Sequence, residues 1–468
     1  MVTMIVAYLS GSRGIGKNGS IPWKSISEDK VHFLNHTIDR TVIMGSKTFF
    51  SLPEQYRPLP SRTNVVLTRS PSDARFDAYR NRATICDLSE GYRLVQNVAP
   101  SEVVVIGGEE IYKAFLSLCT NVWVTVIYSK EECDRHFPLL GDHFNIDRVE
   151  ERQLSKEGVP FQILHMSRIT DPELRTCSAD KAYLRLAQEV LNKSEGRIRE
   201  DRTGTGTYSI FGEQIRFDIS KYAPLLTTKR VPWKSCIEEL LWFMKGQTNA
   251  NILKEKGVNI WNGNSSREFL DKVGLNRLEV GDCGANYSFQ WRFFGQTYGS
   301  CHDSYVPYTE YDQLNNVLKM LRSNPTSRRI FMSSWNPIDL LNTVLPPCHV
   351  SAQFYVDENR LSCHVYQRSC DVFLGLPWNI FSYSVLTHIL AKMTDLVPHE
   401  LIMSFGDVHI YADHLEQLKL QMSRERLCPP VLKIRDQVRK KRFEEISIED
   451  FELVEYNSHP SIRATMSV

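Results

Sequence analysis

The segment 345–380 constrains the fold more than the rest of the chain, because it places a cysteine directly after two prolines and between strand patterns. Proline has no N–H to donate to a β-ladder, so a proline pair interrupts strand pairing. We expect strands over 342–345 and 350–356, on either side of Cys348, and a further alternating strand over 361–367. A Gly-Leu-Pro-Trp-Asn turn follows. The thiol is therefore expected at an irregularity in a sheet.

The residues that follow Cys348 carry groups suited to a phosphorylated heterocycle. Arg368 offers a planar guanidinium fork and Ser369 a small hydroxyl donor, a pair that suits phosphate. Asp371 and Asn379 offer a carboxylate and a two-sided amide, which can read the edge of a heterocycle. A lone cysteine beside a strand is usually a small core residue, but these neighbours favour a nucleophile.

The chain has 468 residues, more than a single hydrophobic core usually supports. We expect a first domain over 1–167, a polar linker over 168–178 and a second domain over 179–468. Strand and helix patterns alternate in the first domain, which predicts an α/β sheet. An amphipathic helix pattern opens the second domain.

Charge and cysteine usage exclude several classes of protein. Lysine plus arginine (56) nearly balances aspartate plus glutamate (55), so no nucleic acid or anionic membrane is expected as a partner. No apolar run approaches a bilayer span and no signal-peptide pattern is present, so a cytoplasmic protein is expected. The eleven cysteines lack framework spacing, which predicts reduced thiols. The cysteines and histidines of 348–370 do not fit zinc-ligand spacing, so no metal is expected.

Glycine patterns in both halves point to loops rather than to nucleotide fingerprints. The GxGxxG match at 14–19 precedes Ser-Ile-Pro-Trp instead of a helix, which favours a mobile loop over a dinucleotide fold. The loop 202–207 lacks the GK[ST] of a P-loop. Two strand–glycine–helix units, 41–48 and 103–112, offer backbone N–H groups to phosphates.

Two acids are candidates for proton chemistry. Asp29 lies in the first turn of a helix expected to begin, with its cap, at Ser27. In an apolar cleft such an acid can pair with the amidine-like edge of a heterocycle and help to protonate it. Glu239 lies in an apolar helix, where an unpaired carboxylate is costly, so we expect a buried acid wired to waters.

The segment 345–380 resembles thymidylate synthase, and the resemblance continues on both sides of it. The N-terminal third resembles dihydrofolate reductase, so the chain is similar to the bifunctional dihydrofolate reductase–thymidylate synthase family. The resemblance implies an α/β first domain, with a mixed, mostly parallel sheet flanked by helices, and an α+β second domain with a large sheet and helices. It implies that dUMP is methylated to dTMP with 5,10-methylenetetrahydrofolate, that NADPH reduces the dihydrofolate formed, and that the synthase domain forms a homodimer.

The resemblance also implies site residues in the synthase domain. Catalytic roles fall on Cys348, Glu239 and Tyr287. The residues implied to bind dUMP are Arg202, Arg328, Arg329, His349, Gln367, Arg368, Ser369, Asn379, His409 and Tyr411, with the two adjacent arginines reaching into the other subunit. Those implied to bind folate are Trp261, Asn264 and Asp371. One motif departs from the family: GANYS at 284–288 stands where GPVYG is usual.

In the reductase domain the resemblance makes Asp29 the catalytic acid. The residues implied to bind folate are Phe33, Arg62 and Thr125, and those implied to bind NADPH are Ala7, Ile15, Gly19, Lys47, Thr48, Arg69, Gly107, Gly108 and Tyr112. Lys30 replaces the usual apolar residue after the acid, so either the register is altered or the lysine stem packs while its amine reaches water. Ser46 replaces a cation near the 2′-phosphate, and Arg69 can supply that charge.

Two other functions remain open from the residues. A deoxycytidylate hydroxymethylase would share the cysteine scaffold but would carry an acid where Asn379 stands. A non-catalytic nucleotide-binding or mRNA-binding protein would need none of the thiol chemistry.

Overall fold

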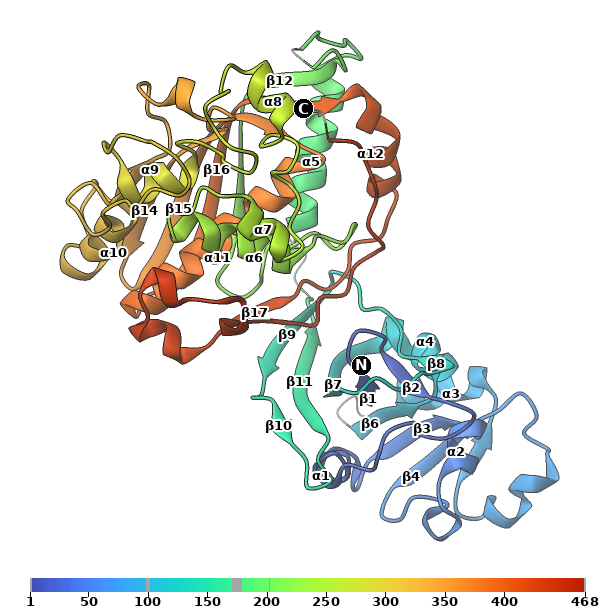
Figure 1. The fold of residues 1–468 in the computed structure, drawn as a ribbon. Helices are drawn as coiled ribbons and strands as arrows, with labels where there is room; N and C mark the ends of the chain where they lie inside the picture. The colour runs from blue at the N-terminus through green and yellow to red at the C-terminus, as the bar shows by residue number, and fades with distance from the viewer. Residues whose placement is uncertain (1, 98–101, 171–178, 202, 467–468) are drawn as a thin grey trace. The chain divides into compact units, whose positions relative to one another are not determined.

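The computed structural model describes residues 2–97, 102–170, 179–201 and 203–466. The chain divides into two compact units, Met1–Arg175 and Thr176–Val468, each with its own sheet (Figure 1). The predicted domain limits lie close to this division, and the linker 168–178 stays a prediction because 171–178 lie outside the described residues. Arg168, its first residue, is the last residue of a strand of the first sheet.

The first unit is built on a mixed sheet of nine strands. Its order is β10-β11-β7-β1-β6-β3-β4-β5, and β9 pairs with β11. The strands of this unit are β1 (Val2–Leu9), β2 (Gly14–Gly16), β3 (Thr41–Gly45), β4 (Thr63–Leu67), β5 (Thr84–Cys86), β6 (Val103–Gly107), β7 (Cys119–Ile127), β8 (Arg135–His136), β9 (Phe144–Val149), β10 (Gln153–Leu154) and β11 (Pro160–Arg168). The helices are α1 (Ser27–Thr37), α2 (Ser46–Ser51), α3 (Leu88–Asn97) and α4 (Glu109–Phe115), with 3₁₀ turns η1 (Glu54–Tyr56), η2 (Ala74–Tyr79) and η4 (Leu116–Leu118).

The central strands of this sheet read as nearly continuous apolar runs. β1, β3, β4, β5, β6 and β7 pair in parallel, whereas β9, β10 and β11 form an antiparallel edge. Parallel strands are covered by helices on both faces, which requires side chains that are apolar on both faces. This confirms the predicted α/β class with a mixed, mostly parallel sheet.

The second unit carries a five-stranded sheet in the order β12-β16-β15-β14-β13. Its strands are β12 (Thr207–Asp218), β13 (Phe331–Ser333), β14 (His349–Asp357), β15 (Arg360–Asp371) and β16 (Val397–Tyr411), with a separate hairpin of β17 (Val431–Ile434) and β18 (Phe451–Val454). The helices are α5 (Ala179–Lys193), α6 (Trp233–Met244), α7 (Asn251–Glu255), α8 (Arg267–Lys272), α9 (Tyr287–Phe293), α10 (Gln313–Ser323), α11 (Gly375–Thr394) and α12 (Leu415–Met422). The 3₁₀ turns are η6 (Leu340–Asn342), η7 (Ala412–His414), η8 (Asp436–Lys440), η9 (Phe443–Glu445) and η10 (Ile448–Asp450).

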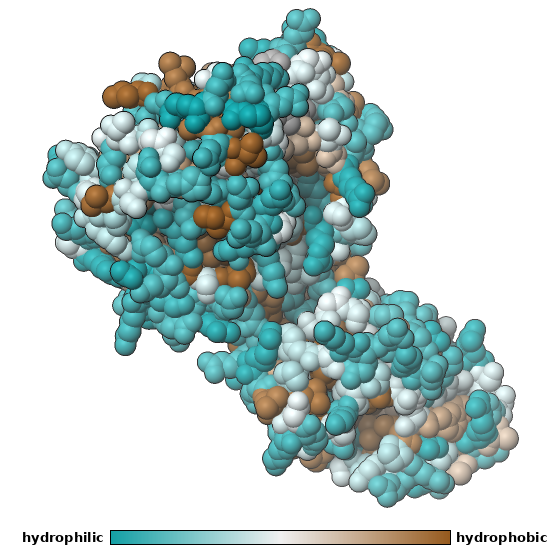
Figure 2. Space-filling model, in the orientation of Figure 1, coloured by the Kyte–Doolittle hydropathy of each residue, from teal (hydrophilic) through white to brown (hydrophobic). Residues whose placement is uncertain are grey.

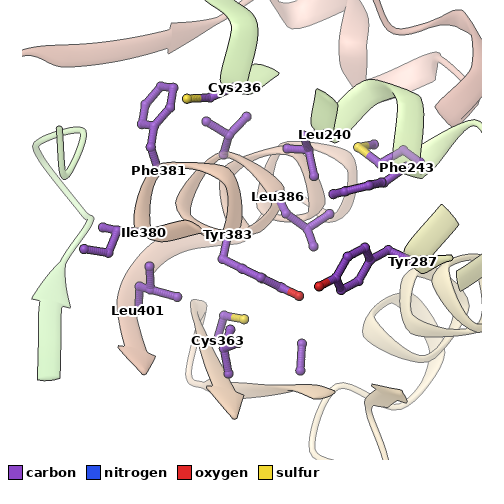
Figure 3. Close-up of a cluster of buried hydrophobic side chains, with 14 of the residues drawn as sticks. Cys236, Leu240, Phe243, Tyr287, Cys363, Ile380, Phe381, Tyr383, Leu386 and Leu401 are labelled. Carbon is purple, nitrogen blue, oxygen red and sulfur yellow. The ribbon is translucent and has the colours of Figure 1, made fainter. Parts of the chain in front are cut away.

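Helix α11 forms the centre of the second core. It is apolar nearly all round, and buried residues such as Ile380, Phe381 and Leu386 pack on β15, β16 and α6 (Figure 3). A helix with this composition is stable only inside a core. Sheet and helices together confirm the predicted α+β class of this unit.

Three local predictions were wrong. The segment 342–345 is not a strand, because a 3₁₀ turn occupies Leu340–Asn342 and the following prolines cannot donate to a ladder. The Gly-Leu-Pro-Trp-Asn segment is not a turn but the first part of α11. The Asp371 carboxylate accepts the backbone N–H groups of 373–375 and so prepares that helix start. Ser27 does not cap α1, whose N-cap is Ile26 without a side-chain bond.

The visible surface carries mostly hydrophilic side chains, with hydrophobic ones in small groups (Figure 2). Among the described residues, no helix is long and apolar enough to cross a membrane.

Candidate active sites

Cys348 lies immediately before β14 and is half-buried. The pairing of β14 with β15 changes register between His349 and Ser351, which confirms the predicted irregularity at the thiol. The Arg368 side chain holds the segment that precedes the cysteine: Nε donates to the Pro347 carbonyl at 2.9 Å and Nη2 to that of Pro346 at 2.7 Å. The proline carbonyls therefore occupy part of the guanidinium fork that the sequence assigned to phosphate.

A chain of polar contacts leads from the cysteine into the core. The Cys348 backbone N–H donates to the Tyr287 hydroxyl at 2.7 Å. The Tyr287 ring stacks on His349 with centroids 3.9 Å apart and planes 9° apart, and His349 Nδ1 lies 2.7 Å from the Tyr383 hydroxyl. The two phenol oxygens point toward each other in Figure 3. Burial raises the pKa of Tyr287 and lowers that of His349 to about 3, so both side chains are neutral at pH 7.

Glu239, on α6, is buried beside this series of polar contacts and has no cationic partner among the described residues. Its Oε1 accepts the indole N–H of Trp261 at 2.7 Å, and its Oε2 accepts that of Trp378 at 2.6 Å. Burial raises the pKa of Glu239 to about 7, and the two indole N–H groups oppose that rise. Such an acid changes protonation state near neutral pH, as a proton carrier must.

A small enclosed cavity adjoins the Glu239 carboxylate. Its polar lining comes from Glu239, His349, Asn379, Ser382 and Tyr383. The Ser382 hydroxyl is buried without a hydrogen-bond partner among the described residues. A polar cavity with an unpaired hydroxyl can hold ordered water. The cavity therefore suits the prediction that Glu239 is a buried acid hydrogen-bonded to water.

The ends of β15 and β16 bring further predicted nucleotide-binding residues together. Parallel pairing sets Ser369 beside Asp407 and Asp371 beside His409. His409 Nδ1 lies 2.8 Å from the Asp407 carboxylate, and Tyr411, two residues on, packs against the His409 ring. Gln367 is buried, donates to the Ser369 carbonyl at 3.0 Å, and keeps its Oε1 without a partner among the described residues. Gln367 pairs across the strands with His349, the residue after Cys348.

Two predicted arginines are not part of this constellation, because Arg328 and Arg329 are exposed on the turn before β13. The prediction for Arg202 falls outside the described residues. The GANYS departure has a structural consequence, because Asn286 caps α9: its Oδ1 accepts the Ser288 backbone N–H at 3.1 Å and the Ser288 hydroxyl at 2.6 Å.

Sequence reasoning missed three residues of this site: Trp378, Ser382 and Tyr383. A helical prediction for 375–394 would have found Tyr383, since it lies four residues after Asn379 and shares its face. No local pattern reveals Trp378 as a Glu239 partner, because 139 residues separate the two.

In the first unit α1 brings Asp29 against β7. Burial raises the pKa of Asp29, and the nearby Thr125 hydroxyl on β7 opposes the rise. Lys30 is exposed, which agrees with the second alternative stated for this residue, in which its amine reaches water. Arg62 lies over the Phe33 ring at 5.9 Å and donates from Nε to Thr37 at 3.0 Å. The predicted pterin-binding residues thus share one region around α1.

Part of the predicted NADPH-binding set lies at or just after the ends of the parallel strands β3, β4 and β6, namely Lys47, Thr48, Arg69, Gly107 and Gly108. Gly107 has φ +132°, and a Cβ on Gly108 would stand 3.2 Å from the Thr48 hydroxyl, so both glycines keep this region open. Lys47 and Arg69 are exposed and form no ion pair among the described residues. Tyr112 instead points inward and donates to the Ile5 carbonyl at 2.7 Å. Ala7 pairs with Thr125, Ile15 lies in β2, and Gly19 has φ +80° in the loop that follows.

Within the described part of the chain, no group of three histidine, cysteine, aspartate or glutamate side chains could hold a metal ion.

Comparison with known proteins gives the same division of the chain. The family model "Dihydrofolate reductase" matches residues 1–168, and the model "Thymidylate synthase" matches 181–468. The bifunctional dihydrofolate reductase-thymidylate synthase of Daucus carota is 40% identical, over 99% of this chain and 95% of the relative. That of Paramecium tetraurelia is 39% identical over 99% and 98%, and that of Leishmania major 36% identical over 99% and 95%.

Both families use folates, and each match covers nearly the whole of one unit. The chain therefore belongs to the bifunctional dihydrofolate reductase–thymidylate synthase family, and it reduces dihydrofolate with its first unit and makes thymidylate with its second.

Proposed function

We propose that Cys348 is the nucleophile of thymidylate synthesis and that Tyr287 and Glu239 handle the protons of the reaction. The observation that carries this proposal is the contact of the Cys348 backbone N–H with the Tyr287 hydroxyl, beside a buried acid whose pKa is about 7. The contact sets the backbone of the cysteine against a phenol, and the Glu239 carboxyl lies close enough to that phenol to influence its pKa. A thiol, a phenol and a carboxylic acid are the three groups that covalent activation of a uracil ring needs.

The reaction proceeds by covalent catalysis. The Cys348 thiolate adds to C6 of dUMP, and the electron pair of the C5–C6 double bond moves toward O4 to give an enolate. C5 of the enolate then attacks the methylene carbon of 5,10-methylenetetrahydrofolate. Loss of the C5 proton and expulsion of tetrahydrofolate leave an exocyclic methylene on C5, with sulfur still bound to C6. Hydride transfer from the tetrahydrofolate to that methylene completes the methyl group, re-forms the C5–C6 double bond and releases the thiolate. The products are dTMP and dihydrofolate.

The remaining residues orient the substrates. Asn379 reads the amide edge of uracil, and Asp371 and Trp261 bind the pterin with Asn264. His409 and Tyr411 bind the ribose 3′-hydroxyl, and Gln367, whose buried Oε1 has no partner among the described residues, faces the nucleotide with His349. Arg202, Arg368 and Ser369 bind the phosphate, together with Arg328 and Arg329 of a second subunit. The exposure of the adjacent pair supports this, since exposed arginines are available to another chain.

In the first unit NADPH supplies a hydride when bound. The open glycines Gly107 and Gly108 fit a pyrophosphate, and the exposed cations Lys47 and Arg69 fit the 2′-phosphate. Asp29 holds the pterin and helps to protonate it, because its raised pKa lets it carry a proton closer to neutral pH than an ordinary carboxyl does. Phe33, Thr125 and Arg62 complete the folate site, the last binding a carboxylate.

We assign the homodimer to the exposed face of the second sheet. Phe331, Tyr355 and Tyr366, on three neighbouring strands, are 49%, 63% and 42% exposed. Aromatic side chains on adjacent strands form an apolar face that gains stability when covered. A reducing, cytoplasmic setting suits the ten described cysteines, none of which forms a disulfide with another described residue.

Subunit complementation tests the role of the adjacent arginines. Cys348→Ser is co-expressed with an Arg328→Ala, Arg329→Ala double variant, each nearly inactive alone in thymidylate formation. If the arginines act across the interface, a mixed dimer contains one intact site and activity returns. No recovery in verified mixed dimers would exclude action across the interface.

A substitution of the nucleophile tests the proposed function itself. Cys348→Ser should abolish thymidylate formation and leave NADPH-dependent dihydrofolate reduction nearly intact, because the two units have separate cores. Both rates are measured spectrophotometrically on one preparation. Substantial thymidylate formation by this variant would mean that another group attacks the uracil.

A further inference from the structure

Glu239 is held by two indoles from distant parts of the chain. Trp261 lies between α7 and α8, Trp378 lies in the first turns of α11, and Glu239 lies on α6. Each indole N–H binds a different carboxylate oxygen, at 2.7 and 2.6 Å. An indole N–H can only donate, so both contacts favour the ionised carboxylate over the neutral acid.

In the part of the chain that the structure describes, no cation pairs with the Glu239 carboxylate. The titratable groups around Glu239 are Cys236 on its own helix, Cys283, Tyr287 on α9, His349 on β14 and Tyr383 on α11. Burial raises the pKa of both thiols and of both phenols and lowers that of the imidazole, so all five are neutral at pH 7. The two indoles are therefore the groups that hold the negative charge.

We propose that Trp378 is a positioning residue for thymidylate synthesis: its indole N–H, with that of Trp261, favours the charged form of the Glu239 carboxylate and turns that carboxylate toward the enclosed cavity. This rests on the proposed role of Glu239. A carboxylate has about four lone-pair directions, and the two indoles occupy one on each oxygen. The others are left for water in the cavity beside Asn379 and Ser382.

The position of Trp378 also connects the acid to substrate recognition. It directly precedes Asn379 on α11, so one helical turn carries both the group that holds Glu239 and the amide proposed to read uracil. A shift of this helix start on binding dUMP would act on both residues at once. The Asp371 carboxylate, which accepts the N–H groups at the start of α11, fixes the same turn.

The test is the titration of Glu239 in the full-length protein, followed through its carboxyl band by infrared difference spectroscopy, with Glu239→Gln identifying the band. Trp378→Phe removes the N–H and keeps an apolar ring. Benzothienylalanine at 378, which keeps the shape of indole but lacks the N–H, gives the same test where phenylalanine disturbs packing. Trp242→Phe is the matched control, because that buried indole on α6 donates to the Asn249 carbonyl at 3.1 Å instead.

We expect either change at 378 to raise the apparent pKa of Glu239 by about one to two units, the size expected for one lost bond to a charged group. The pH profile of kcat for thymidylate formation should move by the same amount, with a smaller change in KM for dUMP. Trp242→Phe should change neither. An unchanged Glu239 titration in both variants overturns the proposal. A shifted titration with an unchanged kcat profile supports the indole contact and instead refutes the proposed role of Glu239 in catalysis.

Discussion

The substitution Tyr287→Phe distinguishes two proposed roles of the Tyr287 hydroxyl, which are to hold Cys348 in position and to act on the substrate. The substitution keeps the ring that stacks on His349 at 3.9 Å and removes only the oxygen that accepts the Cys348 N–H at 2.7 Å. An N–H left without a partner in a partly buried site costs about 1–3 kcal/mol. If the hydroxyl holds the cysteine in its reactive position, that cost corresponds to a roughly ten- to hundredfold loss in the rate of thymidylate formation.

The assay must measure the reactivity of Cys348 in the absence of substrate. We expect the rate of alkylation of Cys348 by iodoacetamide, followed on its own peptide by mass spectrometry, to change in Tyr287→Phe together with kcat. Tyr305→Phe is the control, since that hydroxyl donates to the Ser300 carbonyl at 3.0 Å. An unchanged alkylation rate with a reduced kcat would show that the hydroxyl acts on the substrate alone. An unchanged kcat would refute both roles.

Two predictions concern the reductase unit. Because burial raises the pKa of Asp29 above its unfolded value, the ionised carboxyl costs stability, and this cost grows as pH rises from about 3.8 through the raised value. Asp29→Asn should therefore raise the melting temperature of this unit at neutral pH, with the gain vanishing near pH 4, and should slow dihydrofolate reduction; an equal gain in Glu54→Gln, an exposed site, would contradict this reasoning. Arg69→Ala should weaken the preference for NADPH over NADH roughly tenfold to hundredfold, because Ser46 leaves this arginine as a main cation at the 2′-phosphate. Equal preference in the variant and the parent would show that the charge comes from elsewhere.

The sequence predicted those parts of the fold that follow from local periodicity. The strands expected over 350–356 and 361–367 are β14 and β15, because alternation of buried and exposed side chains has a period of two. The start of α11 was misread as a turn from its glycine and proline. Asp371 carried the missing signal, since its carboxylate accepts N–H groups two to four residues later, as helix-capping side chains do.

The sequence predicted which residues form the site, but it did not predict the contacts that these residues make with one another. The burial of Glu239 follows from its apolar helix, whereas its two partners lie 22 and 139 residues away. Likewise, the stacking of Tyr287 on His349 depends on how α9 meets β14, which no spacing in the chain encodes. Contacts of this kind come from tertiary packing, so local patterns contain no record of them.

The contacts of Arg368 bear on how the phosphate is bound. A guanidinium has five N–H groups, and two of those of Arg368 already hold the Pro346 and Pro347 carbonyls. In the proposed phosphate site this side chain has only part of its fork left for the phosphate, while its contacts to the proline pair hold the segment before Cys348. A dianion bound by this remainder and the Ser369 hydroxyl alone would be poorly neutralised. The other proposed phosphate ligands are Arg202, which lies outside the described residues, and Arg328 and Arg329, which lie exposed before β13, the edge strand of the sheet whose aromatic face is proposed to be covered by a second subunit. The two hydrogen bonds of Arg368 therefore support the proposal that arginines of a second subunit help to complete the phosphate site.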